Sequence, residues 1–327
     1  MKKAIIILDY HEYPQNIYEK LSKKLIVIKY NPRNQNDLKK FLIQKSKNYI
    51  IFAIIAKLGL KFDKQLVDIT NNQLKYVLSP TTGLNHIDVC ELKKNKIKII
   101  YLKNKKFLTS ISSTAEHAWA LILAITRNLK FYDNSIFKKK KWDRGKLINT
   151  EIQGKTIGIV GYGRLGKILA GYAKAFKMKI IIHDKKKLNL PRYITSGSLK
   201  EIFKKSDIIT INLSYKKNNY KIINSKILKE SKKNLILVNT SRGELIDQEY
   251  LFKMLKENKI KFAGLDVLQG DSTWNKIIPK KILKNLKFLE SKVIVTPHVG
   301  GYSEQAVIKT REHLINNFVK ILNKNAD

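Results

Sequence analysis

The most specific chemical signal in the sequence is a glycine-rich segment near its midpoint, TIGIVGYGRLGKILAGYAKAFKMKIIIHD, residues 156–184. An apolar run typical of a buried strand (156–160) precedes a GxGxxG pattern. Apolar residues then recur at helical spacing, which predicts a helix whose N-terminus offers free N–H groups and a positive dipole to a phosphate. The segment therefore predicts a dinucleotide site made by Gly161, Tyr162, Gly163, Arg164, Leu165 and Gly166.

A second apolar run ends at Asp184, eighteen residues after Gly166. An acid at this position accepts hydrogen bonds from an adenosine ribose and repels a 2′-phosphate, so it favours NAD over NADP. Three lysines (185–187) follow directly and could neutralise a 2′-phosphate. We therefore predict NAD as the cofactor and keep NADP as the less favoured alternative.

Two other reactive residues lie at the carboxyl ends of predicted strands, where ligands bind in α/β sheets. Arg242 follows ILVNTS, and its planar guanidinium could hold both oxygens of a carboxylate. His298 lies in TPHVGG and could exchange a proton near neutral pH, the more so beside a carboxylate that raises its pKa. An ordinary surface arginine and a structural histidine are the alternatives. The other five histidines are expected to be structural or surface residues: His11, His86, His117, His183 and His313.

The composition is that of a folded protein with an unusual charge. The 327 residues are 43% hydrophobic, enough for two domains with substantial cores, and the net charge is +39. Only seven of the 65 basic residues are arginine, and the lysines spread along the whole chain. Nucleic-acid grooves usually recruit arginine. The charge therefore indicates a compositional bias, and we expect no nucleic-acid partner.

Targeting, redox and metal signals are weak. The single cysteine, Cys90, excludes an internal disulfide and a cysteine-based metal site, and no metal is predicted. The N-terminal apolar run ends too soon, at Asp9, for a signal peptide, and no run approaches membrane-spanning length. We expect a cytoplasmic protein without a membrane partner.

The remaining sequence alternates strand-like and helix-like segments, which predicts parallel sheets covered by helices. Expected strands before the glycine-rich segment are 4–9, 25–30, 49–56, 74–79 and 98–102, and those after it are 207–214, 234–241, 260–268 and 293–298. Residues 112–129 predict a buried helix that begins with a capping box of Ser113 and Glu116. Residues 130–155 predict an extended arm, and 303–322 an amphipathic helix.

Several ordered motifs together resemble one family, the D-isomer-specific 2-hydroxyacid dehydrogenases, and in particular its phosphoglycerate dehydrogenase-like members. The motifs are SPTTGLNHID, TAEHAWALILAITRN, WDRGKLINTEIQGKTIGIVGYGRLGK, LVNTSRGELID, GLDVLQGD and TPHVGG. The resemblance implies two Rossmann/flavodoxin-like α/β domains. A substrate domain (1–102 and 300–327) would contain an inserted NAD-binding domain (103–299), and the 112–155 region would form a homodimer.

The resemblance also implies the reaction and its residues. An NAD-dependent enzyme would interconvert a 2-oxo acid and a D-2-hydroxy acid, with Arg242 as carboxylate clamp and His298 as acid/base. Asp271 stands where the family has a glutamate, so it would pair with His298 through a side chain shorter by one methylene; the alternative is that Asp271 caps a turn. Thr240 and Asp266 would line the nicotinamide. The substrate carboxylate would bind the loop made by Thr81, Thr82 and Gly83.

Two other functions remain as alternatives. A dinucleotide-sensing binding protein can be built on the same fold, because the fold does not determine the function. The presence of Arg242 and His298 favours an enzyme. A nucleic-acid-binding protein is suggested by the charge alone and would show a steep salt dependence of binding.

Overall fold

A computed structural model describes residues 1–144, 148–274 and 277–324. The chain forms two compact units, which we describe one at a time. The first comprises Met1–Leu108, Ser272–Ile277 and Ser303–Asp327, and the second Thr109–Asp271 and Ile278–Tyr302. The main part of the second unit is thus inserted in the chain of the first, and the predicted α/β fold with an inserted nucleotide-binding domain is confirmed.

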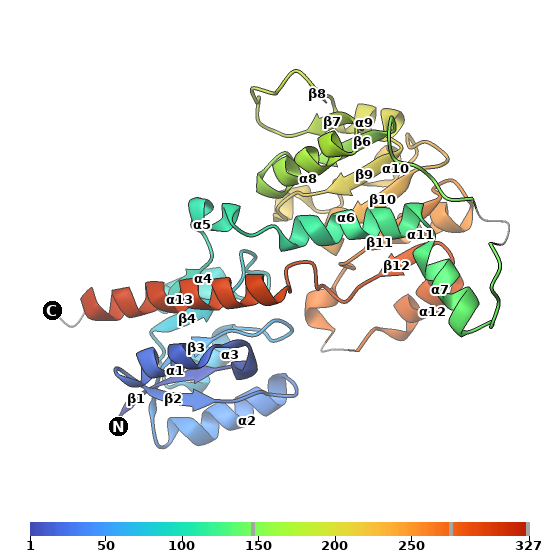
Figure 1. Cartoon of the computed structure of the whole chain (residues 1–327). Coiled ribbons are helices and arrows are strands. Elements are labelled where there is room, and N and C mark those ends of the chain that lie inside the picture. The colour runs from blue at the N-terminus through green and yellow to red at the C-terminus, as the bar shows by residue number, and fades with distance from the viewer. Residues whose placement is uncertain (145–147, 275–276, 325–327) are drawn as a thin grey trace. The chain divides into compact units, whose positions relative to one another are not determined.

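The first unit is built on a parallel five-stranded sheet of order β2-β1-β3-β4-β5 (Figure 1). Its strands are β1 (Lys3–Ile7), β2 (Ile26–Lys29), β3 (Ile50–Ile55), β4 (Tyr76–Ser79) and β5 (Lys98–Tyr101). Successive side chains of a strand point to opposite faces of the sheet. Ile6 and Ile54 accordingly pack in one hydrophobic cluster, and Ile5 and Ile55 in another.

Helices cover both faces of this sheet. The cluster of Ile6 includes side chains from α2 (Gln35–Ser46), α3 (Lys64–Ile69) and α4 (Val89–Lys94). The cluster of Ile5 includes side chains from α1 (Gln15–Ser22), α5 (Lys105–Thr109) and the C-terminal α13 (Glu304–Lys324). A short 3-10 helix, η1 (Tyr10–Glu12), follows β1. Helix α13 therefore completes a core that begins at the other end of the chain.

The second unit contains a parallel seven-stranded sheet of order β12-β11-β10-β9-β6-β7-β8. Its strands are β6 (Thr156–Val160), β7 (Lys179–His183), β8 (Ile194–Ser196), β9 (Ile208–Ile211), β10 (Ile236–Asn239), β11 (Phe262–Leu265) and β12 (Val293–Val295). The strand order reverses between β6 and β9. In a doubly wound sheet, this reversal leaves a crevice beyond the carboxyl ends of the strands, where ligands bind.

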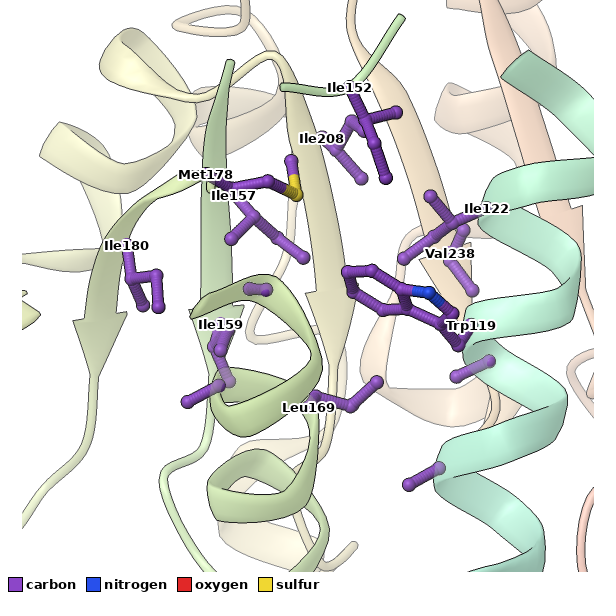
Figure 2. Close-up of a cluster of buried hydrophobic side chains, with 14 of the residues drawn as sticks. Trp119, Ile122, Ile152, Ile157, Ile159, Leu169, Met178, Ile180, Ile208 and Val238 are labelled. Carbon is purple, nitrogen blue, oxygen red and sulfur yellow. The ribbon is translucent and has the colours of Figure 1, made fainter. Parts of the chain in front are cut away.

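Two helices pack on one face of this sheet, α6 (Ser113–Thr126) and α8 (Arg164–Ala175). Figure 2 shows Trp119 of α6 pointing between the sheet and Leu169 of α8, among side chains that include Ile157 and Val238. Trp119 is only 7% exposed, and burying an aromatic ring of this size contributes on the order of 3 kcal/mol. Trp119 thereby joins both helices to the sheet, on which α6 packs against β10 and β11 and α8 against β6 and β7.

The other elements of the second unit are shorter. They are α7 (Leu129–Phe137), α9 (Leu199–Lys205), α10 (Ser225–Leu228), α11 (Gln248–Lys256), α12 (Lys280–Phe288), η2 (Lys217–Asn219), η3 (Gly243–Leu245) and η4 (Asp271–Thr273, which continues into the first unit). Side chains of α9 and α11 are buried, and α9 packs on β6 and β7. No helix in the described part of the chain is long and apolar enough to cross a membrane.

The structure corrects two local predictions. The expected extended arm over 130–155 is wrong at its start, because residues 129–137 form α7 after a break at Asn128, whose φ is 50°. The expected capping box is also wrong: α6 has Ser112 as its N-cap, and Ser113 lies within the first turn. The Ser113 hydroxyl donates instead to the carbonyl of Gly300 at 2.9 Å, so it serves a tertiary contact. Residues 145–147 of the expected arm lie outside the described residues.

Candidate active site

The glycine-rich turn between β6 and α8 requires glycine at two positions. Gly161 has a φ of +96°, and a Cβ there would lie 2.9 Å from the backbone of Asn212. A Cβ on Gly166 would lie 2.2 Å from the carbonyl oxygen of Gly161. Helix α8 therefore packs directly against the turn, with no room for a methyl group between them.

The same turn leaves open space at Gly163, which is the N-cap of α8. No side chain caps this helix end, and a Cβ on Gly163 would meet nothing within 4 Å. Exposed N–H groups at a helix N-terminus favour an anion such as a phosphate. The geometry therefore fits a dinucleotide whose pyrophosphate lies at this end of α8.

Two buried oxygens beside the strand-order reversal have no hydrogen-bond partner in the described structure: Oδ1 of Asn212, after β9, and Oγ1 of Thr240, after β10. Leaving such an atom unsatisfied costs about 1–3 kcal/mol. A bound dinucleotide could satisfy both atoms. Asn212 was not singled out from the sequence, where nothing marks it among many asparagines.

The other residues of the predicted dinucleotide site lie in three different environments. Tyr162 is buried and Leu165 partly buried in the core of the second unit. The Arg164 guanidinium donates to the carbonyl of Ile111, and burial lowers its pKa. The carboxylate of Asp184 accepts from the amide of Tyr162 at 2.9 Å, which ties the end of β7 to the glycine-rich turn.

Alanine at Gly166 is expected to raise the dissociation constant of NADH by about 10–100-fold, because its Cβ would displace the turn at a cost of about 1–3 kcal/mol. Fluorescence titration measures this. Gly171 of the same helix is the matched control, since a Cβ there meets nothing within 4 Å. Gly171→Ala should leave NADH affinity unchanged and stabilise the fold by roughly 0.5–1 kcal/mol. Equal NADH affinity in both variants would contradict the close packing.

A second cluster lies beyond the carboxyl ends of β10, β11 and β12. It contains Arg242, Asp266, Asp271 and His298, all in the second unit. His298 Nδ1 lies 3.2 Å from Asp271 Oδ2. The aspartate therefore brings a carboxylate to the histidine although its side chain is shorter than that of a glutamate.

The backbone at His298 has a φ of 57°, a conformation that only a few per cent of non-glycine residues adopt. The His298 amide donates to the carbonyl of Asp266 at 2.8 Å, which holds the turn after β12 against β11. Strained backbone of this kind clusters at functional sites and is stabilised by its surroundings. Here it determines the direction of the His298 side chain.

The loop that carries Asp271 is held by close contacts with the segment after Arg242. A Cβ on Gly243 would lie 2.1 Å from the carbonyl carbon of Leu268, so only glycine fits there. The buried side chain of Gln248 accepts from the amide of Gln269 at 2.8 Å. The position of Asp271 thus depends on β10 and α11 as well as on β11.

Arg242 is partly buried next to acidic groups. Burial lowers the pKa of its guanidinium, whereas the carboxylates of Asp271, Glu244 and Asp266 raise it. Arginine remains charged in either case. One of its nitrogens, Nη1, donates to the carbonyl of Ser241 at 2.6 Å. The cation is therefore a fixed anchor point for an anion.

Asp266 is 2% exposed and fully hydrogen-bonded. Its Oδ1 accepts from the Thr296 hydroxyl at 2.6 Å and the Val299 amide at 2.8 Å, and its Oδ2 accepts from the Gly300 amide at 2.8 Å. Burial alone would raise the pKa of this carboxyl, but hydrogen bonds from His117, Thr296 and the two amides outweigh it and lower the pKa below its ordinary value of 3.8.

This lowered pKa predicts a pH-dependent contribution to stability. The folded state favours ionised Asp266, so the contribution is present above the ordinary pKa of 3.8 and is lost as the pH falls through the lower folded-state value. Asp266→Asn should therefore reduce the free energy of unfolding by about 1–3 kcal/mol at neutral pH and by less in acid. Urea unfolding at several pH values measures this difference in the free energy of unfolding. A difference that does not change with pH would contradict the lowered pKa of Asp266.

The predicted substrate loop lies in the first unit, directly after β4. The Thr81 hydroxyl donates to the carbonyl of Gly83 at 2.7 Å and lies 2.8 Å from the Ser79 hydroxyl.

Three polar residues lie just beyond neighbouring strands of the same sheet: Asp9 after β1, Asn31 after β2 and Lys57 after β3. Lys57 is buried, and its ammonium contacts Asp9 at 2.5 Å and also Asn31.

Among the predicted residues, the structure thus gathers Arg242, Asp266, Asp271 and His298 in the second unit, and Thr81, Thr82 and Gly83 belong to the first. His117, which contacts Asp266, was expected to be structural because an isolated histidine carries no signal. No group of three or more His, Cys, Asp or Glu side chains in the described ranges could hold a metal ion.

Comparison with known proteins identifies the matching family. Residues 119–300 match the model of the D-isomer specific 2-hydroxyacid dehydrogenase, NAD binding domain. A hydroxypyruvate reductase of Thermotoga maritima is 30% identical over 270 residues, 83% of this chain and 84% of that protein. A glyoxylate reductase of Thermococcus litoralis is 34% identical over 263 residues, 78% and 75% of the two chains.

A solved structure is also similar over nearly the whole chain. It is an acyclic imino acid reductase in complex with NADPH and D-Arg, with 28% identity and a TM-score of 0.79. The match covers 98% of this chain and 97% of the other. The similarity therefore extends through both units and includes a protein that holds a phosphorylated dinucleotide.

Proposed function

The chain belongs to the family of D-isomer specific 2-hydroxyacid dehydrogenases, which act on CH–OH groups with NAD(P), and from that premise we propose that it reduces a small, non-phosphorylated 2-oxo acid with NADH. Glyoxylate and hydroxypyruvate define the substrate class. The contact between His298 and Asp271 at 3.2 Å is the observation that carries the proposal.

The proposed mechanism uses three residues of the second cluster: Arg242, Asp271 and His298. Arg242 holds the substrate carboxylate and polarises the 2-oxo group, and the backbone of Thr81, Thr82 and Gly83 also binds that carboxylate. His298 Nδ1 lies 3.2 Å from Asp271 Oδ2, and His298 donates a proton from Nε2 to the carbonyl oxygen as that oxygen gains negative charge. The hydride that adds to the carbonyl carbon comes from the reduced cofactor. The product is a 2-hydroxy acid.

The proposed cofactor site comprises the turn from Gly161 to Gly166, Asp184, Thr240 and Asp266. Asp184 supports NAD, because a carboxylate at the end of β7 repels a 2′-phosphate. The side chains of Lys185–Lys187 are exposed and offer the opposite charge. The proposal therefore requires a higher kcat/KM with NADH than with NADPH, and the reverse order would contradict it.

The pairing of Lys57 supports a substrate without a phosphate. Its ammonium lies on the carboxyl edge of the five-stranded sheet, beside β4 and Thr81 in strand order, and Asp9 already neutralises it. A buried charge that is compensated in this way offers little attraction to a second anion. Small neutral substituents on C2 of the 2-oxo acid are therefore favoured.

Asp9→Asn should change this preference, because it leaves the Lys57 charge without its partner. We expect the ratio of kcat/KM for 3-phosphohydroxypyruvate to that for hydroxypyruvate to rise about tenfold, the value of one charge-assisted hydrogen bond. Taking the ratio within one variant removes any effect of a reduced folded fraction. An unchanged ratio in a folded variant would show that Lys57 has no part in substrate choice.

We also propose that the enzyme is a cytoplasmic homodimer that associates through residues 112–155. Large apolar side chains in this region are exposed: Phe137 by 77%, Trp142 by 92% and Ile148 by 89%. A cavity of about 1030 Å³ beside α6 and α7 is lined by apolar side chains such as Ile125, Phe131 and Phe262, and also by seven lysines. Sedimentation equilibrium tests the association, and a monomer at assay concentrations would contradict it.

A panel of substrates tests the proposed reaction. Purified protein and NADH are mixed with glyoxylate, hydroxypyruvate, pyruvate and 3-phosphohydroxypyruvate, and the loss of NADH absorbance is followed. The proposal predicts the highest kcat/KM for glyoxylate or hydroxypyruvate. Tight NADH binding without oxidation by any of the four would contradict the proposed substrate class and favour a dinucleotide sensor.

A further inference from the structure

A second histidine lies beside the proposed catalytic cluster, on helix α6. The His117 side chain is 22% exposed, and its Nε2 lies 2.9 Å from the Thr296 hydroxyl and 3.3 Å from Asp266 Oδ1. All three residues belong to the second unit. The proposed mechanism gives His117 no task.

The hydrogen bonds around Thr296 fix the proton on this ring. A hydroxyl has a single proton to donate, and Thr296 donates it to Asp266 Oδ1 at 2.6 Å. An ionised carboxylate only accepts. The Nε2 of His117 must therefore carry a proton, which it donates to Thr296 and Asp266 together.

The groups that His117 contacts control the turn that carries His298. Asp266 accepts from the amides of Val299 and Gly300, and its own carbonyl accepts from the amide of His298. A Cβ on Gly300 would lie 2.8 Å from Asp266 Oδ2 and 3.5 Å from His117 Cδ2, so the packing leaves little freedom. A change in the Asp266 carboxylate would therefore affect the backbone amides directly after His298 and the Thr296 side chain before it.

Helix α6 contacts this turn at a second point, where the Ser113 hydroxyl donates to the carbonyl of Gly300. Ser113 and His117 are four residues apart and thus lie on one face of the helix. Another side of the same helix is buried in the core of the second unit through Trp119 and Ile122. Contacts with α6 therefore hold the turn after β12 in place, in addition to its contacts with the sheet.

We propose that His117 is a positioning residue for the dehydrogenase reaction: its Nε2–H orients the Asp266 carboxylate and, through Thr296 and the turn 296–300, the side chain of His298. The inference rests on the proposed function, because Asp266 and His298 have their roles there. It goes beyond that function by giving helix α6 a part in the chemical step.

Removing the N–H donor should lower kcat more than it changes binding. His117→Leu has a similar volume and no donor, and a hydrogen bond to a charged group corresponds to about tenfold to a hundredfold in rate. We expect a fall in kcat of that size. The KM for hydroxypyruvate and the dissociation constant of NADH should change by less than about threefold, since Asp266 keeps its carboxylate and the other proposed binding groups, Arg242 and the glycine-rich turn among them, are untouched.

His117→Gln should restore most of the activity, because its side-chain amide carries an N–H donor at about the same distance from the backbone. Glu116→Gln is the matched control, as it changes a neighbouring exposed residue of α6 that does not contact Asp266. Its kinetic constants should equal those of the wild type. Thermal unfolding of each variant shows that the rates refer to folded protein.

A double-mutant cycle with Thr296→Val tests the route of the effect. The shorter of the two His117 contacts is the one to Thr296, at 2.9 Å against 3.3 Å to Asp266, so His117→Leu should lower kcat by less than about threefold in the Thr296→Val background. Equal effects in both backgrounds, a kcat of His117→Leu within twofold of the wild type, or a Gln variant as slow as the Leu variant would each overturn the inference. Wild-type protein that reduces no 2-oxo acid would overturn the proposed function as well.

Discussion

Alanine in place of His298 is expected to lower kcat by about 10²–10⁴-fold, the usual contribution of a positioned general acid. The proton for the developing alkoxide would then have to come from water. The dissociation constant of NADH should stay within about threefold of the wild type, because the glycine-rich turn between β6 and α8 is a separate part of the second unit. Steady-state kinetics and fluorescence titration of NADH measure the two quantities.

Two results would contradict this assignment. A His298→Ala variant with a kcat within about threefold of the wild type would exclude His298 as the proton donor. A variant that binds NADH poorly and has an unchanged kcat would give His298 a role in binding. Asp271→Asn provides a related test, since removing the carboxylate charge 3.2 Å from His298 Nδ1 should lower kcat if the two residues act as a pair.

Lysine in place of Arg242 is expected to lower kcat/KM for hydroxypyruvate by about 10²–10³-fold. The change keeps the positive charge but removes the planar fork that can bind both oxygens of a carboxylate. A buried ammonium would also lack the guanidinium contact with the Ser241 carbonyl that fixes the side chain. Steady-state kinetics at several concentrations of the oxo acid measure the effect.

Arg192 supplies the matched control for this substitution, because it is an exposed arginine of the same unit. Arg192→Lys should leave kcat/KM unchanged. If Arg242→Lys behaves in the same way, charge alone binds the substrate and the two-oxygen clamp is excluded. If Arg242→Lys unfolds at a clearly lower temperature than the wild type, Arg242→Gln gives a second measurement of the clamp.

The sequence predicts the fold well where the hydrophobic pattern is strong. The apolar run at 156–160 followed by Gly161, Gly163 and Gly166 specifies β6, its turn and α8, because a buried parallel strand and the glycine spacing leave few alternatives. Strand β8 was missed because its three residues, Ile194–Ser196, are too few to show a period. Helix α7 was missed because its apolar residues are interrupted by the polar Asp133 and Asn134.

The site is less predictable, since its contacts join residues far apart in the chain. Their position at the end of a strand identified Arg242 and His298 as candidates from the sequence. The structure adds the contacts that hold these two residues in place. The positive φ of His298 and the lack of space for a Cβ at Gly243 depend on neighbouring segments, so no local pattern reveals them. Ser113 and His117 illustrate the same limit, because a serine near a helix start predicts a cap and a lone histidine predicts nothing.

In the proposed reaction, the protein transfers hydride from NADH to C2 of a small 2-oxo acid and forms the D-2-hydroxy acid. The most direct measurement incubates the enzyme with hydroxypyruvate and NADH and resolves the product by chiral chromatography. We expect one equivalent of D-glycerate for each NADH oxidised, and no product from the His298→Ala variant on the same timescale. L-glycerate, or NADH oxidation without glycerate, would contradict it.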